Sequence, residues 1–202
     1  MELTIKPLSP ELTADYFDFF NHRAFTDNPP HGGCYCIAWQ YTKEEEKAQL
    51  WDRVDAYGSE NFMRVLREIV VRQIASGALR GYLAYVDGVS VGWCNANDKA
   101  NYPTECAIGF RMPAPAEKRE KAVVCFEIAP EYRGKGVATA LLNRVVADAK
   151  AEGYAAVEGY PCVRSERREW DYPGPVRLYE KLGFTAIPRQ DSSIVMRKEL
   201  EE

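Results

Sequence analysis

The sequence predicts an α/β fold built on a mixed β-sheet, and three features indicate it. A continuous, β-branched apolar run at 122–130 is followed by a glycine-containing loop, an amphipathic stretch and another apolar run at 154–160, as in a β-α-β unit. Two alternating runs within 81–95 are typical of a hairpin. Apolar residues at helical spacing fill much of the chain before Gly77. Parallel and antiparallel strand pairs should therefore occur in one sheet.

The N-terminal part should begin with a short strand and a helix. Residues 3–8 alternate like a strand, and the segment 9–11 combines an N-cap serine, a first-turn proline and an early acid. A helix is expected to begin there and to run to about Phe25. The stretch 27–36 is rich in turn-forming residues and should end the helical pattern.

Two further helices should precede the hairpin, one within 42–57 and one from Ser59 to just before Gly77. The second has an apolar stripe that we interpret as core packing, formed by Phe62, Met63, Leu66, Ile69, Val70 and Ile74. Within the hairpin, Asp87-Gly88 tolerates the positive φ angles of a type I′ turn.

The chain after the hairpin should be irregular before the β-α-β unit begins. Residues 98–119 contain three prolines and scattered charges. The helix of the β-α-β unit should end before Gly153, with Val137, Leu141, Val145 and Ala149 along one face. A short helix within 175–183 and strand-like pieces around Phe184 and 193–198 complete the chain.

Length and charge restrict the class of protein. The chain has 202 residues, enough for one substantial core, and a formal net charge of −4. Non-specific nucleic-acid binding needs a broad basic surface, so it is not expected. No apolar stretch approaches the roughly 20 residues that span a bilayer, and the N-terminus lacks the layout of a signal peptide. We therefore predict a cytoplasmic protein without membrane contact.

The six cysteines are expected to be mostly reduced thiols in the cytoplasm. Only Cys34 and Cys36 are close in sequence, and this CxC spacing differs from the CxxC spacing usual in zinc and redox sites. We favour small residues packed in a strand or tight loop, and we predict no metal site. A metal or redox site with His31 as a further ligand is the alternative.

The loop before the helix of the β-α-β unit is suited to a pyrophosphate. A helix N-terminus has unpaired N–H groups and a partial positive charge, and Gly134 and Gly136 leave the approach to it open. Arg133 and Lys135 add positive charge at the same point. The spacing of a P-loop is absent, and Thr139 stands where the dinucleotide-binding fingerprint needs its third glycine.

The segment 133–138, Arg-Gly-Lys-Gly-Val-Ala, fits the R/Q-x-x-G-x-G/A pattern of the GCN5-related N-acetyltransferases (GNAT), which the chain resembles. A second match, VRLYEKLGF at 176–184, is similar to the C-terminal helix and strand start of that superfamily. The resemblance implies one acetyltransferase domain over 1–202, with inserted segments near 26–60 and 98–120. It also implies a mostly antiparallel sheet that splays between the fourth and fifth strands, with helices on both faces.

The resemblance further implies acetyl-CoA as co-substrate. Its pyrophosphate would bind the glycine loop, formed by Arg133, Gly134, Lys135, Gly136, Val137 and Ala138. The pantetheine arm would pair with the exposed edge of the fourth strand near Phe126, Glu127 and Ile128. One backbone N–H there could stabilise the oxyanion of the tetrahedral intermediate.

Acetyl transfer to an amine needs a base for the amine and an acid for the leaving thiolate. By resemblance, Tyr179 is the candidate acid, because the phenol at this position typically points at the coenzyme sulfur. Ala122 stands where some relatives carry a glutamate base. Glu127 and Glu158 interrupt apolar strands and are the candidate bases, although either could be structural and paired with an arginine. We favour Glu158, which should lie near the end of its strand that faces the acceptor.

Trp93 and Asn95, at the end of the hairpin, are candidate residues of the acceptor pocket. The leading hypothesis is acetyl transfer from acetyl-CoA to a primary amine of a small molecule or protein by direct attack. A sensor that binds acetyl-CoA without turnover, and a metal or redox site at the CxC loop, are the competing hypotheses. The resemblance also suggests a homodimer.

Overall fold

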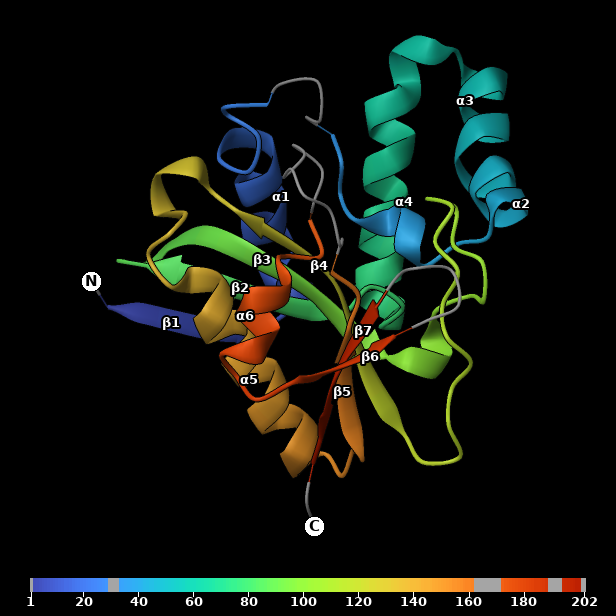
Figure 1. The fold of residues 1–202 in the computed structure, drawn as a ribbon. Coiled ribbons are helices and arrows are strands. Elements are labelled where there is room, and N and C mark those ends of the chain that lie inside the picture. Colours follow the sequence, from blue (N-terminus) through green and yellow to red (C-terminus); the bar gives the residue numbers. More distant parts are fainter. Residues whose placement is uncertain (1, 29–32, 162–171, 189–193, 201–202) are drawn as a thin grey trace.

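The computed structural model describes residues 2–28, 33–161, 172–188 and 194–200 (Figure 1). Among them, seven strands form one sheet in the order β1-β2-β3-β4-β5-β7-β6. The strands are β1 (Leu3–Pro7), β2 (Gly81–Val86), β3 (Val89–Asp98), β4 (Glu120–Ile128), β5 (Ala156–Gly159), β6 (Thr185–Pro188) and β7 (Ile194–Glu199). Strands β4 and β5 are parallel, and the other neighbouring pairs are antiparallel. The predicted mixed sheet is confirmed.

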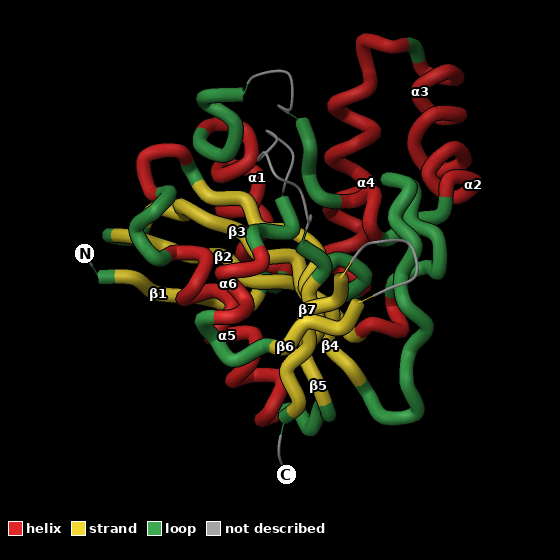
Figure 2. Tube along the Cα trace, viewed as in Figure 1, coloured by secondary structure: helices red, strands yellow, loops and turns green. Residues whose placement is uncertain are grey.

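Helices surround this sheet (Figure 2). They are α1 (Thr13–His22), α2 (Lys43–Glu46), α3 (Asp52–Tyr57), α4 (Phe62–Ser76), α5 (Val137–Ala151) and α6 (Val176–Glu180). No helix in the described part of the chain is both long and apolar enough to cross a membrane.

The side chains of the central strands alternate between two cores, one on each face of the sheet. Trp93 and Cys125 belong to the core beneath α1 and α4, whereas Cys94 and Phe126 belong to the core beneath α5 and α6. We call these sides the α1 face and the α5 face. The expected helices on both faces are therefore present, and the neighbours Phe126 and Glu127 point to opposite sides.

The sheet opens between its two parallel strands. Strand β5 pairs only with the first part of β4, from Glu120 opposite Ala156 to Val123 opposite Gly159. Strand β4 continues to Ile128 without β5 beside it. The expected splay between the fourth and fifth strands is confirmed, and it leaves one backbone edge of β4 without β5 beside it after Val123.

The three helical segments before the hairpin differ from the sequence prediction. The first is shorter, because the proline-led stretch Pro10–Leu12 forms a 3-10 turn and α1 begins only at Thr13. The segment 42–57 begins with the Thr42 capping box but is divided by a π-helical turn at Lys47–Trp51. The helix expected from Ser59 starts as a 3-10 turn at Ser59–Asn61, and α4 begins at Phe62. In the hairpin, Asp87 and Gly88 both have positive φ, as predicted for a type I′ turn.

Beside the α1 face, residues 33–60 contact residues 98–120 (Figure 1). The Ala107 N–H donates to the Tyr41 carbonyl at 2.7 Å, and the rings of Phe110 and Trp39 are 5.4 Å apart. Because Phe110 also packs against Tyr160 just after β5, at 5.2 Å, these segments close one end of the α1 face.

Candidate functional site

The glycine loop between β4 and α5 presents unbonded backbone N–H groups. Gly134 and Gly136 have φ values of +73° and +86°, and a Cβ at either position would meet no atom within 4 Å. Apart from bonds inside α5, the N–H groups of 134–139 donate no backbone hydrogen bond to the described residues. Gly136 is the N-cap of α5, so these groups also receive the positive end of the helix dipole. The predicted anion site has the required local geometry.

The Arg133 guanidinium is occupied by contacts within the protein. It donates to the Ile128 carbonyl at 2.9 Å, and it forms ion pairs with Asp27 at 2.5 Å and with Glu127 at 3.3 Å. This arginine therefore ties the loop to the end of β4. Lys135 lies over the Tyr132 ring, 5.5 Å from its centroid, and its side chain is exposed to solvent beside the loop.

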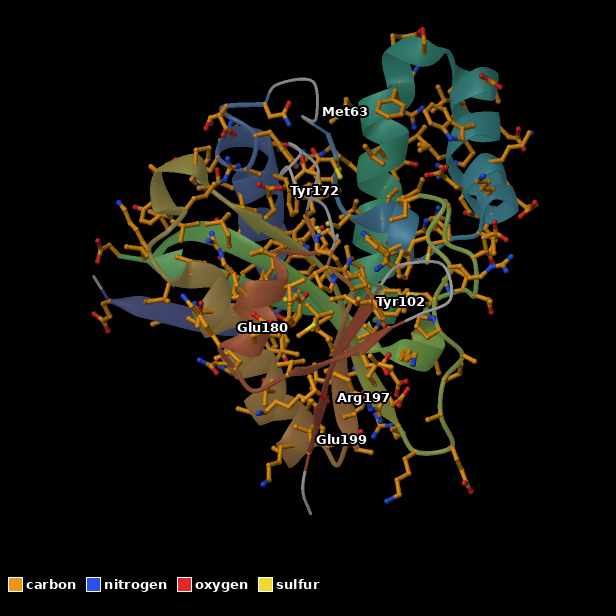
Figure 3. The ribbon with its side chains drawn as sticks, viewed as in Figure 1. Met63, Tyr102, Tyr172, Glu180, Arg197 and Glu199 are labelled. Carbon is orange, nitrogen blue, oxygen red and sulfur yellow. The ribbon has the colours of Figure 1, made fainter. Side chains whose placement is uncertain are left out.

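Phe126 and Tyr179 place two hydrogen-bond donors in the splay, the gap where β4 separates from β5. The Phe126 N–H points from the free edge of β4 and donates to the Tyr172 carbonyl at 2.7 Å. Tyr179 is fully buried on α6, and its phenol donates to the Pro173 carbonyl at 2.7 Å. Burial raises the pKa of Tyr179 well above its ordinary value, so the phenol keeps its proton at neutral pH. Tyr172, which precedes α6, is labelled in Figure 3.

The Tyr179 ring reaches this position only because residue 159 is a glycine. A Cβ on Gly159 would lie 2.1 Å from Cε1 and 2.6 Å from the phenol oxygen of Tyr179. A glycine inside a strand often marks the close approach of another group, and this is the signal that the sequence offers at Gly159, which is not among the predicted site residues. Gly159 is therefore a positioning residue for the candidate acid.

Glu127 is buried on the α1 face, directly after Phe126. Burial raises the pKa of its carboxyl group to about 8, against the opposing effect of Arg133. A carboxyl group with this pKa is partly ionised near neutral pH and is a stronger proton acceptor than an ordinary glutamate. Its cross-strand neighbour on β3 is Trp93. Both features suit a general base.

Glu158 lies in a buried ion cluster on the same face. Its carboxylate is 2.7 Å from the Lys99 ammonium and 2.7 Å from the guanidinium of Arg197, which lies on β7 (Figure 3), and it accepts a 3.0 Å hydrogen bond from Tyr160. Glu120 shares Lys99, at 2.8 Å, and Arg197. Because both carboxylate oxygens of Glu158 are already bonded, these contacts favour a structural role for Glu158 over a role as the base.

Replacing Lys99 with methionine should lower the free energy of unfolding by roughly 3 to 5 kcal/mol, because two buried carboxylates would lose their shared cation. Lys47→Met is the matched control. Lys47 pairs with Asp52 on the surface, so this change should leave the free energy of unfolding almost unchanged. Urea unfolding at neutral pH measures both. Equal losses in the two variants would contradict the structural role of the cluster.

The same cluster predicts that the folded state loses stability in acid. Burial raises the pKa of Glu120, but hydrogen bonds from Lys99 and Arg197 outweigh it and hold the pKa below the ordinary value of 4.5. A lowered carboxyl pKa in the folded state contributes stability above the unfolded pKa, and this stability is lost as the pH falls through the folded value.

Trp93 and Asn95 form the floor of the α1 face. Both are fully buried. Asn95 accepts a hydrogen bond from the Tyr102 phenol at 2.9 Å, and its amide donates to the Cys36 carbonyl at 3.3 Å. These contacts fix the segment around Cys36 against β3. Contact of Trp93 and Asn95 with an acceptor stays a prediction.

The two cysteines of the CxC motif have different surroundings. Cys34 is exposed, whereas Cys36 is buried with its sulfur 3.2 Å from that of Cys125 on β4. The hydrogen bond with Cys125, together with burial, raises the pKa of the Cys36 thiol, which makes it a poor nucleophile. No group of three His, Cys, Asp or Glu side chains among the described residues suits a metal ion, and His31 lies outside those residues.

Residues 40–184 match the family model described as the acetyltransferase (GNAT) family. A search of curated protein sequences gave no match.

Several solved structures share the fold over nearly the whole chain. A protein from Corynebacterium glutamicum described as histone acetyltransferase HPA2 and related acetyltransferase has a TM-score of 0.55 at 20% identity, over 100% of this chain and 98% of its own. A GNAT-family acetyltransferase from Streptococcus pneumoniae has a TM-score of 0.53 at 16% identity, over 99% and 100%. PaiA N-acetyltransferase from Thermoplasma acidophilum, in complex with coenzyme A, has a TM-score of 0.50 at 17% identity, over 98% and 99%.

Proposed function

Because the chain belongs to the acetyltransferase (GNAT) family, we propose that it transfers an acetyl group from acetyl-CoA to a primary amine of a small molecule or protein by direct attack. Acetyl-CoA is its co-substrate. The observation that carries the proposal is that three candidate groups lie near the point where β4 leaves β5, two of them hydrogen-bond donors and the third a carboxyl group on the α1 face. They are the Phe126 N–H, the Tyr179 phenol and the Glu127 carboxyl group.

The coenzyme would bind along one continuous surface from the loop to the splay. Its pyrophosphate accepts hydrogen bonds from the N–H groups of 134–138, the last two being those of Val137 and Ala138 at the start of α5. Lys135 supplies a positive charge from the solvent side. Arg133 acts through its bond to the Ile128 carbonyl, which fixes the loop relative to β4. The pantetheine amides pair with the free edge at Phe126 and Ile128.

The chemistry then needs two proton transfers. As the nitrogen of the neutral amine forms a bond to the thioester carbon, Glu127 accepts one of its protons. The Phe126 N–H stabilises the oxyanion of the tetrahedral intermediate. As the C–S bond breaks, Tyr179 donates its proton to the leaving thiolate. Glu158 takes no part in these steps and stabilises the fold through its ion cluster.

The charges near Glu127 favour a cationic acceptor. Asp27 is half-exposed and shares Arg133 with Glu127, so two carboxylates face one guanidinium. Once the Glu127 carboxyl group is ionised, at a pH above its pKa of about 8, an ammonium group entering the α1 face would meet two carboxylates against one guanidinium. Both small amines and protein amines satisfy the requirement.

The glycine loop gives a first prediction. Gly136→Ala should weaken coenzyme A binding about ten-fold, because an L-residue is strained at φ +86° by ~1 to 2 kcal/mol and its Cβ would occupy the approach to the loop. Gly153→Ala is the matched control, with φ +74° and equally open surroundings away from the loop. Isothermal titration calorimetry measures both affinities. An unchanged Kd in Gly136→Ala would contradict pyrophosphate binding at this loop.

The function itself is tested by release of free coenzyme A thiol from acetyl-CoA in the presence of a panel of primary amines and amine-bearing peptides. Amine-dependent release with formation of the N-acetyl product is the expected result. Tight binding of acetyl-CoA without release for any amine would favour the sensor hypothesis.

A further inference from the structure

The two donors assigned to the thioester are already bonded to the protein's own chain. The Phe126 N–H donates to the Tyr172 carbonyl, and the Tyr179 phenol donates to the Pro173 carbonyl, each at 2.7 Å. These carbonyls belong to consecutive residues. In the proposed reaction the same two donors bind the thioester oxygen and the neighbouring sulfur. One short peptide segment therefore occupies both hydrogen-bond donors that the thioester oxygen and sulfur would need.

We propose that residues 172–175, here called the strap, form an internal ligand of the thioester site that acetyl-CoA must displace. The proposal rests on the proposed function, because it identifies the thioester site by Phe126 and Tyr179. Displacement makes the apparent Kd of acetyl-CoA equal to the intrinsic Kd divided by the fraction of molecules with the strap released.

The composition of the strap suits a segment that presents backbone carbonyl groups as acceptors and few backbone N–H donors. Pro173 and Pro175 have no N–H, and Pro175 is extended, with φ −81° and ψ 151°. Gly174 has φ +82°, and a Cβ there would lie 3.1 Å from Leu178 and 3.5 Å from Phe126. Glycine is thus required for the strap to lie flat against β4 and α6. The two prolines reduce the entropy lost when the strap is ordered.

The strap also covers the α1 face. The Tyr172 ring packs against Phe25 with centroids 6.3 Å apart. Burial, and then the proximity of Glu127, Cys34 and Cys125, raise the pKa of the Tyr172 phenol. The side chain of Tyr172 therefore lies beside the candidate base while its carbonyl fills the oxyanion position. Releasing the strap would open the coenzyme site and uncover the base together, so acetyl-CoA should bind before the amine.

Two substitutions loosen the strap by different routes. Gly174→Ala strains its bound conformation, and Tyr179→Phe removes one of its two hydrogen bonds. Each should tighten acetyl-CoA binding by about five- to ten-fold. This is the effect expected when the strap loses one net hydrogen bond, or when a residue other than glycine must adopt the positive φ of position 174. Tyr179→Phe should at the same time lose turnover, since the phenol is the proposed acid. Gly153→Ala is the control and should leave the Kd unchanged.

Calorimetric titration of acetyl-CoA into wild-type protein and these variants separates the possible results. Tighter binding in Tyr179→Phe together with slower turnover supports the strap. If the phenol contacted only the coenzyme, its removal would not tighten coenzyme binding. Wild-type binding with equal or weaker affinity in Tyr179→Phe overturns the strap and leaves the proposed function intact. Absence of binding in every protein overturns both. Tyr179→Phe keeps the test decisive if Gly174→Ala does not fold.

Discussion

Replacing Glu127 with glutamine should lower kcat/KM for acetyl transfer by roughly 10²- to 10⁴-fold, because the amide cannot accept the proton of the attacking amine. In the wild-type enzyme, kcat/KM should rise with pH and level off above the carboxyl pKa of about 8. This limb should be missing from Glu127→Gln. Steady-state kinetics between about pH 6 and 9.5 measure both effects.

Glu158→Gln is the control for this experiment, since it tests the competing base. It should lose stability through the ion cluster but keep its kcat when assayed below its unfolding temperature. The reverse pattern, with an active Glu127→Gln and an inactive but folded Glu158→Gln, would restore Glu158 as the base and refute the assignment of Glu127.

Glu127→Gln should also be more stable than the wild type at alkaline pH. The folded pKa of about 8 lies above the ordinary value of 4.5, so the wild type loses stability as the pH rises from the lower value to the higher one. Glutamine does not ionise and escapes this loss. The variant should gain up to roughly 5 kcal/mol at pH 9 and nothing at pH 4, as thermal unfolding at both pH values would show.

Gly159→Ala should disturb both the fold and the reaction. Gly159 is paired with β4 on one side and β7 on the other, so its backbone cannot withdraw from the Tyr179 ring. The added methyl group would lie 2.1 Å from that ring and must displace it. We expect a loss of about 1 to 3 kcal/mol in unfolding free energy and at least a roughly ten-fold fall in kcat, because the phenol leaves the splay.

Gly92→Ala, also in a central strand, separates crowding from catalysis. Its Cβ would lie 3.0 Å from the flexible ends of Ile128 and Val137, which can move by a few tenths of an ångström. It should lose less stability than Gly159→Ala and keep its kcat. A Gly159→Ala enzyme with the wild-type kcat would show that the position of Tyr179 is unimportant for the reaction.

The features predicted correctly from sequence are those that depend on local backbone chemistry. The turn at Asp87-Gly88 needs positive φ angles, and the residue types alone indicate this. The loop at Gly134 and Gly136 is open because neither residue has a Cβ, which is also evident from the residue types. The parallel pair around α5 follows from a continuous apolar run before and after an amphipathic helix.

The features missed depend on contacts between distant parts of the chain. The sequence favours Glu158 as the base because it should lie at the end of its strand that faces the acceptor, but Lys99 from the irregular segment and Arg197 from the last strand pair with it. A sequence pattern gives no sign that these two cations meet one carboxylate. The same holds for the Phe126 N–H and the Tyr172 carbonyl, whose partnership exists only after β4 and the segment before α6 come together.

The central claim is that the splay of β4 from β5 holds the thioester of acetyl-CoA. A crystal structure of the complex with acetyl-CoA tests it most directly. The thioester oxygen should accept a hydrogen bond from the Phe126 N–H, the sulfur should face the Tyr179 phenol, and the pyrophosphate should lie on the N–H groups of 134–138. A complex with the coenzyme bound elsewhere, while the Phe126 N–H keeps its bond to Tyr172, would contradict the claim.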